Sequence, residues 1–128
     1  DPFTVTMYYQ VRLLEPLGYR PDLFSCVQCG EEIQPQNQYF SSVAGGVLCP
    51  RCGKNAEGVI PVSLNALKYL RHFQRSNYKD ARRAQIPPGT RREMESLLQS
   101  YLTFLLERNL NSPDFLRKVR NHRGGTDS

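Results

Sequence analysis

Apolar residues at helical spacing predict the first structural element of the chain. They recur every three or four positions over residues 3–14, as on one buried helix face, and they are Phe3, Met7, Val11 and Leu14. Pro16 and Gly18 follow. Because proline lacks a backbone donor and glycine favours the turn that closes a helix, we expect this helix to end there, early or with a kink at Pro16.

Two further helices are predicted in the second half of the chain. Ser63 is a candidate N-cap, and the apolar side of the helix after it would hold Leu64, Leu67, Leu70 and Phe73. A capping-box pattern at residues 90–93 precedes a wider apolar face made of Met94, Leu97, Leu98, Tyr101, Leu102 and Leu105. A short helix is expected over residues 114–120. Such faces usually pack in a core, but Phe104 and Leu106 widen the second face, which leaves open whether part of it meets another chain.

All four cysteines of the protein flank a predicted β-hairpin. The hairpin has strands at residues 38–42 and 47–49 and a turn at 44–46. The cysteines follow the pattern C-x2-C-x19-C-x2-C and are Cys26, Cys29, Cys49 and Cys52. This is the spacing of a two-knuckle zinc site, because two intervening residues let both sulfurs of a pair turn onto one ion. Gly30 and Gly53 follow the pairs and would allow the tight turns that bring backbone N–H groups to the sulfurs.

Two other interpretations of the cysteines compete with zinc. A disulfide framework requires an oxidising compartment, and no signal-peptide pattern is recognisable in the chain. A thioredoxin-like pair requires a βαβ setting and would not occur twice. His72 and His122 lie far from the cysteines in the sequence. We therefore expect one structural Zn²⁺ per chain in a closed four-thiolate site, which offers no open position for catalysis, and we do not expect an enzyme.

Length and composition limit the architecture. With 128 residues, 39% of them hydrophobic, the chain is long enough for one globular domain with a small insert. We expect a mainly α fold, a helical domain with an inserted four-cysteine zinc ribbon. Its parts would be an N-terminal helix at 1–23, the ribbon at 24–60, the helical domain at 61–121 and a loose tail at 122–128. No apolar run approaches the roughly 20 residues of a membrane span. The chain begins with Asp1 in helical material, so we expect it to be a fragment that lacks an N-terminal part.

Basic residues concentrate in one segment. The formal net charge is +5, and residues 68–92 contain eight lysines and arginines against one aspartate. Aromatic residues lie among them, and a further basic run follows at 117–123. Arginine binds phosphate through its planar fork, and aromatic rings stack on bases, so this segment is a candidate for contact with nucleic acid or phosphate; a solvated basic face is the alternative. The candidate contacts are Lys68, Arg71, Arg75, Lys79, Arg82 and Arg83.

Three stretches of the sequence resemble a known family. They are "VRLLEPLGYRPDLFSCVQCG", "YFSSVAGGVLCPRC" and "RREMESLLQSYLTFLLERNLNSPDFL". Together they are similar to the C-terminal portion of RecO, a bacterial mediator of recombinational DNA repair, over residues 11–116. The approach to the first cysteine pair, the return into the second pair and the closing helix are specific in this combination.

The resemblance implies a set of properties. RecO proteins have an N-terminal OB-fold and a helical C-terminal domain with a zinc insert. They bind single-stranded and double-stranded DNA, work with RecR and single-strand-binding protein, and act in the bacterial cytoplasm on the nucleoid without breaking bonds or using a small-molecule substrate. The four cysteines match the family's zinc positions one for one. No membrane association is implied.

Two departures from the family pattern matter. The OB-fold is absent from this chain, so DNA binding would depend on its own basic surface. Pro16 stands where relatives continue an apolar helix. The alternative to a DNA-binding mediator is a protein-interaction module for RecR or single-strand-binding protein, with DNA bound elsewhere in the full-length protein. An enzyme with a redox or zinc centre lacks an open ligand position and a nucleophile–base pair.

Overall fold

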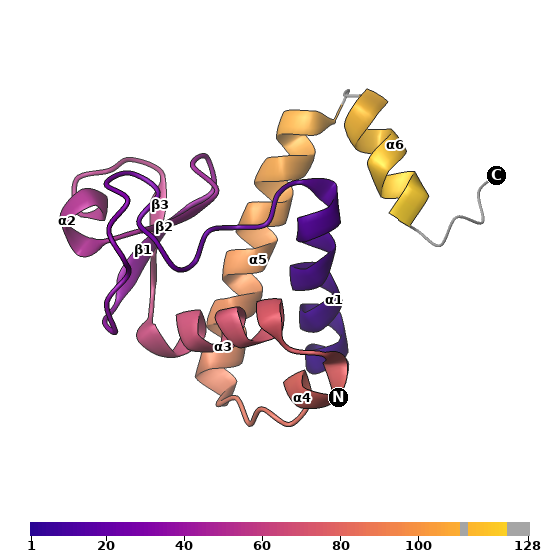
Figure 1. Ribbon diagram of the computed structural model, residues 1–128, viewed down its shortest axis with the longest axis horizontal. Coiled ribbons are helices and arrows are strands. Elements are labelled where there is room, and N and C mark those ends of the chain that lie inside the picture. The colour runs from indigo at the N-terminus through magenta and orange to yellow at the C-terminus, as the bar shows by residue number, and fades with distance from the viewer. Residues whose placement is uncertain (111–112, 123–128) are drawn as a thin grey trace.

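Helices α1, α3 and α5 form the body of the protein in the computed structural model, which describes residues 1–110 and 113–122. α1 and α5 run side by side, and α3 crosses them at one end and contacts both (Figure 1). The short helices α2 and α4 lie in the ribbon and after α3, respectively. The helices are α1 Pro2–Leu17, α2 Pro50–Gly53, α3 Leu64–Arg75, α4 Tyr78–Ala81, α5 Pro88–Asn109 and α6 Pro113–His122.

The first helix ends at Leu17 and is closed by Gly18, as its sequence predicted, and it continues through Pro16. The Asp1 carboxylate accepts from the N–H of Phe3 and caps the helix, and Gly18 closes it in the left-handed conformation with a φ of 89°. Pro16 lies inside the last turn, so the expectation of an early end at this residue was wrong. A proline there removes one backbone hydrogen bond close to the end of the helix, where the loss is small.

The N-cap of α3 joins that helix to α5. Ser63 accepts from the N–H of Ala66, as predicted, and its own N–H and Oγ donate to the Glu93 carboxylate at 2.6 Å each. α5 begins at Pro88, so the predicted capping box at residues 90–93 was wrong, since Glu93 caps a different helix. Leu64 is 36% exposed and does not join the buried face of α3.

A small antiparallel sheet carries the cysteine-containing segments. It has the order β2-β1-β3, with β1 Gln38–Ser41, β2 Gly46–Leu48 and β3 Val59–Val62. Phe40 in the central strand lies opposite Val47 on one side and Ile60 on the other. The predicted hairpin is confirmed, but β3 was not predicted. It contains Pro61, which is tolerated because β3 is an edge strand.

The sheet and the helices share one hydrophobic core. The ring of Phe40 packs edge-on against Tyr101 of α5, with centroids 5.3 Å apart. The Tyr101 hydroxyl donates to the carbonyl oxygen of Tyr19 at 2.8 Å, just beyond the end of α1. The mainly helical fold with an inserted four-cysteine ribbon is therefore confirmed.

The C-terminal part is only partly described. The predicted short helix is α6, which contacts α1. The predicted loose tail lies outside the described residues, apart from its first residue, which ends α6. Within residues 1–110 and 113–122, no helix has the length and apolarity needed to cross a membrane.

Candidate metal centre and basic surface

The four cysteine sulfurs meet at one end of the ribbon. All of the Sγ atoms lie within 4.8 Å of one another, and those of Cys29 and Cys49 are 4.0 Å apart. Four sulfurs around a zinc ion, at about 2.3 Å each, lie about 3.8 Å apart. A disulfide needs about 2.05 Å, and all four thiols are free. The arrangement suits a metal ion that binds thiolates.

The two predicted glycines act differently. Gly30 has a φ of 80° and donates to the carbonyl oxygen of Cys26 at 2.8 Å, as the tight-turn interpretation requires. Gly53 has no positive φ. A Cβ at Gly53 would lie 2.4 Å from the ring of Tyr39, so this glycine is required because the strand packs directly against α2.

The surroundings of Cys26 favour a thiolate. Its side chain is 2% exposed, and burial alone would raise its pKa, but backbone N–H groups of Cys29, Cys49 and Gln28 lower it to about 6. The N–H of Cys49 lies 3.4 Å from this sulfur. Burial and the neighbouring thiols raise the pKa of Cys52 to about 12. Without a cation, the cluster therefore favours a thiolate at Cys26 and a protonated thiol at Cys52. Four thiolates so close together would repel one another unless a positive ion neutralised them.

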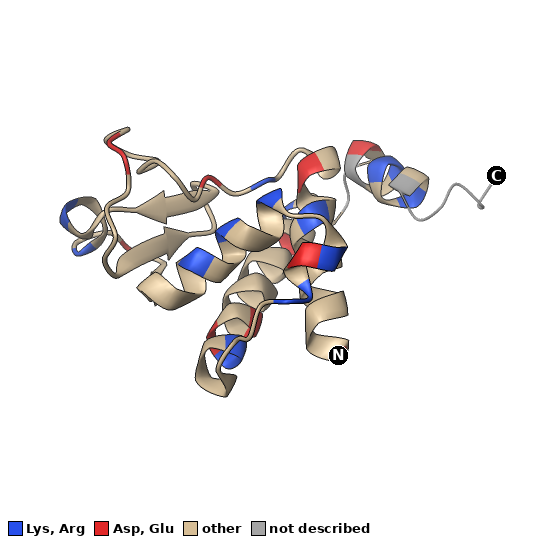
Figure 2. Ribbon diagram, turned by 60° about the horizontal axis from the view of Figure 1, so that its bottom comes forward, with Lys and Arg blue, Asp and Glu red and all other residues tan. Residues whose placement is uncertain are grey.

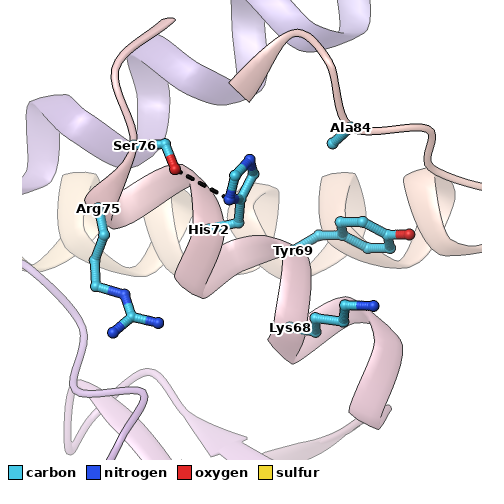
Figure 3. A pocket seen from close by; sticks show the side chains of 6 residues that line it. All are labelled: Lys68, Tyr69, His72, Arg75, Ser76 and Ala84. Atoms are coloured by element: carbon cyan, nitrogen blue, oxygen red, sulfur yellow. Dashed lines mark hydrogen bonds between the residues drawn. The ribbon is translucent and has the colours of Figure 1, made fainter. Parts of the chain in front are cut away.

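A second candidate site lies along α3. Figure 3 shows a hollow between α3 and the segment after α4, with the His72 imidazole and the Tyr69 ring turned into it. Its volume is about 420 Å³. It is lined by Lys68, Tyr69, His72, Arg75, Ser76 and Ala84. Two of the predicted nucleic-acid contacts, Lys68 and Arg75, thus flank one concave surface, which we call the α3 hollow.

Hydrogen bonds fix the walls of the α3 hollow. The Nε2 atom of His72 lies 3.3 Å from the carbonyl oxygen of Asp80, which can only accept, so Nε2 carries the proton. Nδ1 then accepts from the Ser76 hydroxyl at 3.0 Å. The Tyr69 hydroxyl donates to the carbonyl oxygen of Gln85 at 3.2 Å. The ammonium group of Lys68 lies 5.5 Å from the centroid of the Tyr69 ring and can attract an anion there, whereas the guanidinium of Arg75 is turned away from His72 and Tyr69 (Figure 3).

Arg71 points to a different partner. Its Nε and Nη2 donate to the carbonyl oxygen of Leu23, and its guanidinium lies 4.9 Å from the ring centroid of Phe24. Burial and the nearby charge of Arg75 lower its pKa. Arg75 lies on the same ring, 4.6 Å from the centroid. Phe24 therefore holds two cations side by side, a role that its position in the sequence did not indicate.

The other predicted contacts lie on and after α4. Lys79, Arg82 and Arg83 are exposed, and Arg83 lies 3.8 Å from the Asp80 carboxylate. α4 contacts α3, and Figure 2 shows basic residues at intervals along α3 and again around α4. The six predicted residues thus lie on neighbouring elements, although Arg71 is turned toward the loop that leads to the cysteines.

Comparison with known proteins gives consistent matches. The family model described as "Recombination protein O C terminal" matches residues 1–114. A protein named DNA repair protein RecO from Roseiflexus sp. (strain RS-1) is 43% identical over 112 residues, covering 88% of this chain and 40% of that protein. The protein of the same name from Symbiobacterium thermophilum is 34% identical over 125 residues, covering 96% of this chain and 49% of that protein. The chain thus spans less than half the length of these two relatives. No solved structure matches it.

Proposed function

The chain belongs to the Recombination protein O C-terminal family, and from that premise we propose that it is the zinc-stabilised, DNA-contacting part of a DNA repair protein. Its role is to bring DNA and partner proteins together rather than to catalyse a reaction. Work on chromosomal DNA would place it in the bacterial cytoplasm. The observation that carries the proposal is the α3 hollow, where the side chains of Lys68 and Arg75 flank a concave surface of a basic protein.

One structural Zn²⁺ is proposed at the ribbon, bound by Cys26, Cys29, Cys49 and Cys52. The proximity of the four sulfurs supports this assignment, as does the closed donor set without histidine or carboxylate. The ion would join the two segments that carry the cysteine pairs, residues 26–29 before β1 and residues 49–52 after β2. The sequence placed the zinc insert at residues 24–60. We propose that it extends to residue 62, because β3 pairs with β1 up to Val62.

DNA contact is proposed to be electrostatic. Lys68, Arg75, Lys79, Arg82 and Arg83 are exposed and would bind phosphates, while Arg71 supports the surface from behind through Leu23. Neutralising phosphates releases counterions, so affinity falls with salt. With about four phosphates contacted, log affinity against log salt should have a slope of about −3 for a single strand.

The test is a salt titration of the chain with fluorescein-labelled single-stranded DNA, with zinc measured on the same sample. We expect one zinc per chain and a steep negative slope. Replacing Lys68 and Arg75 together by glutamate should weaken binding at least tenfold at low salt. The matched control is Lys54→Glu with Arg108→Glu, which changes the net charge by the same amount at positions outside the basic segment.

Each result separates the alternatives. Equal weakening by both pairs of substitutions would mean that total charge, not the α3 hollow, attracts DNA. Absence of binding at low salt by the zinc-loaded chain would overturn DNA contact by this part of the protein. Because Arg75 also lies on the ring of Phe24, its replacement could disturb the fold, and circular dichroism checks that the variants are folded.

A protein-interaction module is the second candidate. Exposed leucines at the end of α5 and in α6 support it, and these are Leu106, Leu110 and Leu116. The partner would be a RecR-like or single-strand-binding protein, and DNA would bind elsewhere in the full-length protein. Charge reversal at Arg82 and Arg83 that removes partner binding and leaves DNA binding intact would favour this module.

A further inference from the structure

Two adjacent tyrosines of α1 and a third tyrosine in α4, distant in the sequence, form a cluster. The rings of Tyr8 and Tyr9 in α1 meet edge-on with centroids 5.6 Å apart, and Tyr8 meets Tyr78 of α4 in the same way at 5.4 Å. The rings of Tyr9 and Tyr78 are nearly parallel, with an interplanar angle of 21° and centroids 6.4 Å apart. We call this set the tyrosine cluster. Nothing in the α3 hollow or the metal centre uses it.

The cluster is held rigidly on one side and open on the other. Arg12 donates from Nη1 to the carbonyl oxygen of Ser76 at 2.5 Å, and its guanidinium lies 5.4 Å from the Tyr8 centroid. Tyr8 and Tyr78 are half-buried, whereas Tyr9 is 62% exposed. The cluster therefore presents one accessible aromatic ring on a fixed base, so binding a flat ligand would order little that is not already ordered.

The tyrosine cluster adjoins the α3 hollow. Ser76 lines the hollow with its side chain and receives the Arg12 hydrogen bond with its carbonyl group, and Tyr78 follows two residues later. The wall of the hollow at Ser76 is thus joined, by the Arg12 hydrogen bond and through Tyr78, to the helix that carries the exposed ring of Tyr9. Nucleic acids contain both negatively charged phosphate groups and flat aromatic bases. The basic residues would attract the phosphates and the exposed ring would stack on a base, so nucleic acid is the class of ligand that fits both features.

We propose that Tyr9, backed by Tyr78 and Tyr8, stacks on an unpaired base of single-stranded nucleic acid whose phosphates lie on the α3 hollow. The inference rests on the proposed function and names the form of nucleic acid that the site prefers. In a duplex both faces of a base are already stacked on its neighbours, so the ring of Tyr9 gains nothing there. In a single strand every base has a free face, which makes such stacking insensitive to sequence.

The test compares three end-labelled ligands of equal length at low salt: oligothymidylate, an abasic deoxyribose-phosphate oligomer, and a duplex. The abasic oligomer keeps the phosphates and lacks the bases, so the affinity ratio isolates stacking from charge. We expect the zinc-loaded chain to bind oligothymidylate about tenfold more tightly than the abasic oligomer. The chain contains no tryptophan, so stacking should also quench its tyrosine emission with oligothymidylate but not with the abasic oligomer.

Two substitutions at one exposed position provide the matched comparison. Tyr9→Leu removes the ring, and we expect the ratio to fall to about one, with affinities for the duplex and the abasic oligomer unchanged. Tyr9→Phe keeps the ring and should keep the ratio. Equal binding of oligothymidylate and abasic oligomer by the unmodified chain, or an unchanged ratio in Tyr9→Leu, overturns the stacking inference alone. Failure of all three ligands to bind would instead overturn the proposed function and, with it, this inference.

Discussion

Arg71 donates two hydrogen bonds to the carbonyl oxygen of Leu23, from Nε at 2.9 Å and from Nη2 at 2.7 Å. Leu23 lies three residues before the first cysteine of the candidate metal centre, and Arg71 lies between two residues of the α3 hollow in sequence. Phe24 adds to the connection because both Arg71 and Arg75 lie over its ring. The metal centre and the basic surface are thus mechanically joined at this loop.

Replacing Arg71 by lysine keeps the charge but loses the planar fork that gives two bonds to one oxygen. We expect the variant to be destabilised by about 1 to 3 kcal/mol, as for a half-buried hydrogen bond from a charged group. Urea unfolding of the zinc-loaded chain measures the change. Arg82→Lys is the control, since Arg82 is exposed and the change should be within about 0.5 kcal/mol. If the two substitutions changed the free energy of unfolding equally, Arg71 would have no special structural role.

Sequence was a sufficient guide where the constraint is local. The cysteine spacing predicted that four sulfurs would meet, because each pair is fixed by its own turn and the hairpin between them returns the chain. The Ser63 cap was also predictable, because serine is a preferred N-cap residue and it comes directly before a run of apolar residues at helical spacing. Tyr9, in contrast, carries no local sign that it would stack beside Tyr78.

The failures concern partners that lie far apart in sequence. Glu93 fits a capping box three residues after Thr90, but Ser63 competes for its carboxylate across the packed helices. Arg71 shares a helix face with Lys68 and Arg75, and spacing alone gave it the same role. Spacing could not reveal that Arg71 also donates to the carbonyl oxygen of Leu23 in the loop after α1, and its contact with nucleic acid stays a prediction.

Gly53→Ala tests the close packing of α2 on the sheet. The added Cβ would lie 2.4 Å from Cδ2 and 2.7 Å from Cγ of Tyr39, so strand and helix must separate. We expect destabilisation by about 1 to 3 kcal/mol and weaker zinc retention. Thermal unfolding and chelator competition measure both.

A second background makes the Gly53 prediction specific. In a Tyr39→Ala chain the two ring atoms nearest the added Cβ are absent, and only the Cβ of residue 39 remains close, at 2.8 Å. Gly53→Ala should therefore cost less in that chain, and the two substitutions should be non-additive. Gly58→Ala is the comparison for backbone strain alone, because its φ is 71° and no atom lies within 4 Å of the added Cβ. Simple additivity at Gly53 and Tyr39 would refute the packing argument.

Tyr101 should make stability depend on alkaline pH. Burial, with a smaller effect of Tyr19, raises the pKa of its hydroxyl to about 12 in the folded chain, against about 10 when unfolded. The unfolded chain therefore releases the proton first, so this stabilisation is complete below about pH 10 and is lost as pH rises toward 12. The stability advantage of the unmodified chain over Tyr101→Phe should shrink over that range in urea unfolding. Its difference from Leu98→Ala, which removes no ionisable group, should not change with pH.

Metal removal should loosen the ribbon before the helices. Apart from the sulfur atoms, the cysteine segments are held largely by backbone hydrogen bonds of turns and loops, such as that from the N–H of Val27 to the carbonyl oxygen of Val47. The helices α1, α3 and α5, in contrast, bury Met7, Leu67 and Met94 in the core. Chelation should therefore speed amide hydrogen exchange over residues 24–53 and leave α5 protected, as mass spectrometry can measure. Cys26→Ser should reproduce the effect, and Ser25→Ala should not.

The same treatment should reach the basic surface. Once the cysteine segment is released, Leu23 and Phe24 no longer hold Arg71 and Arg75 in place, so affinity for single-stranded DNA should fall several-fold at constant salt. The salt slope should change little, because the charges themselves remain. Re-adding Zn²⁺ should restore both exchange protection and affinity. If hydrogen exchange shows that the ribbon has opened but the DNA affinity is unchanged, the metal centre and the basic surface are not coupled. The loop at Leu23 would then support the metal centre alone.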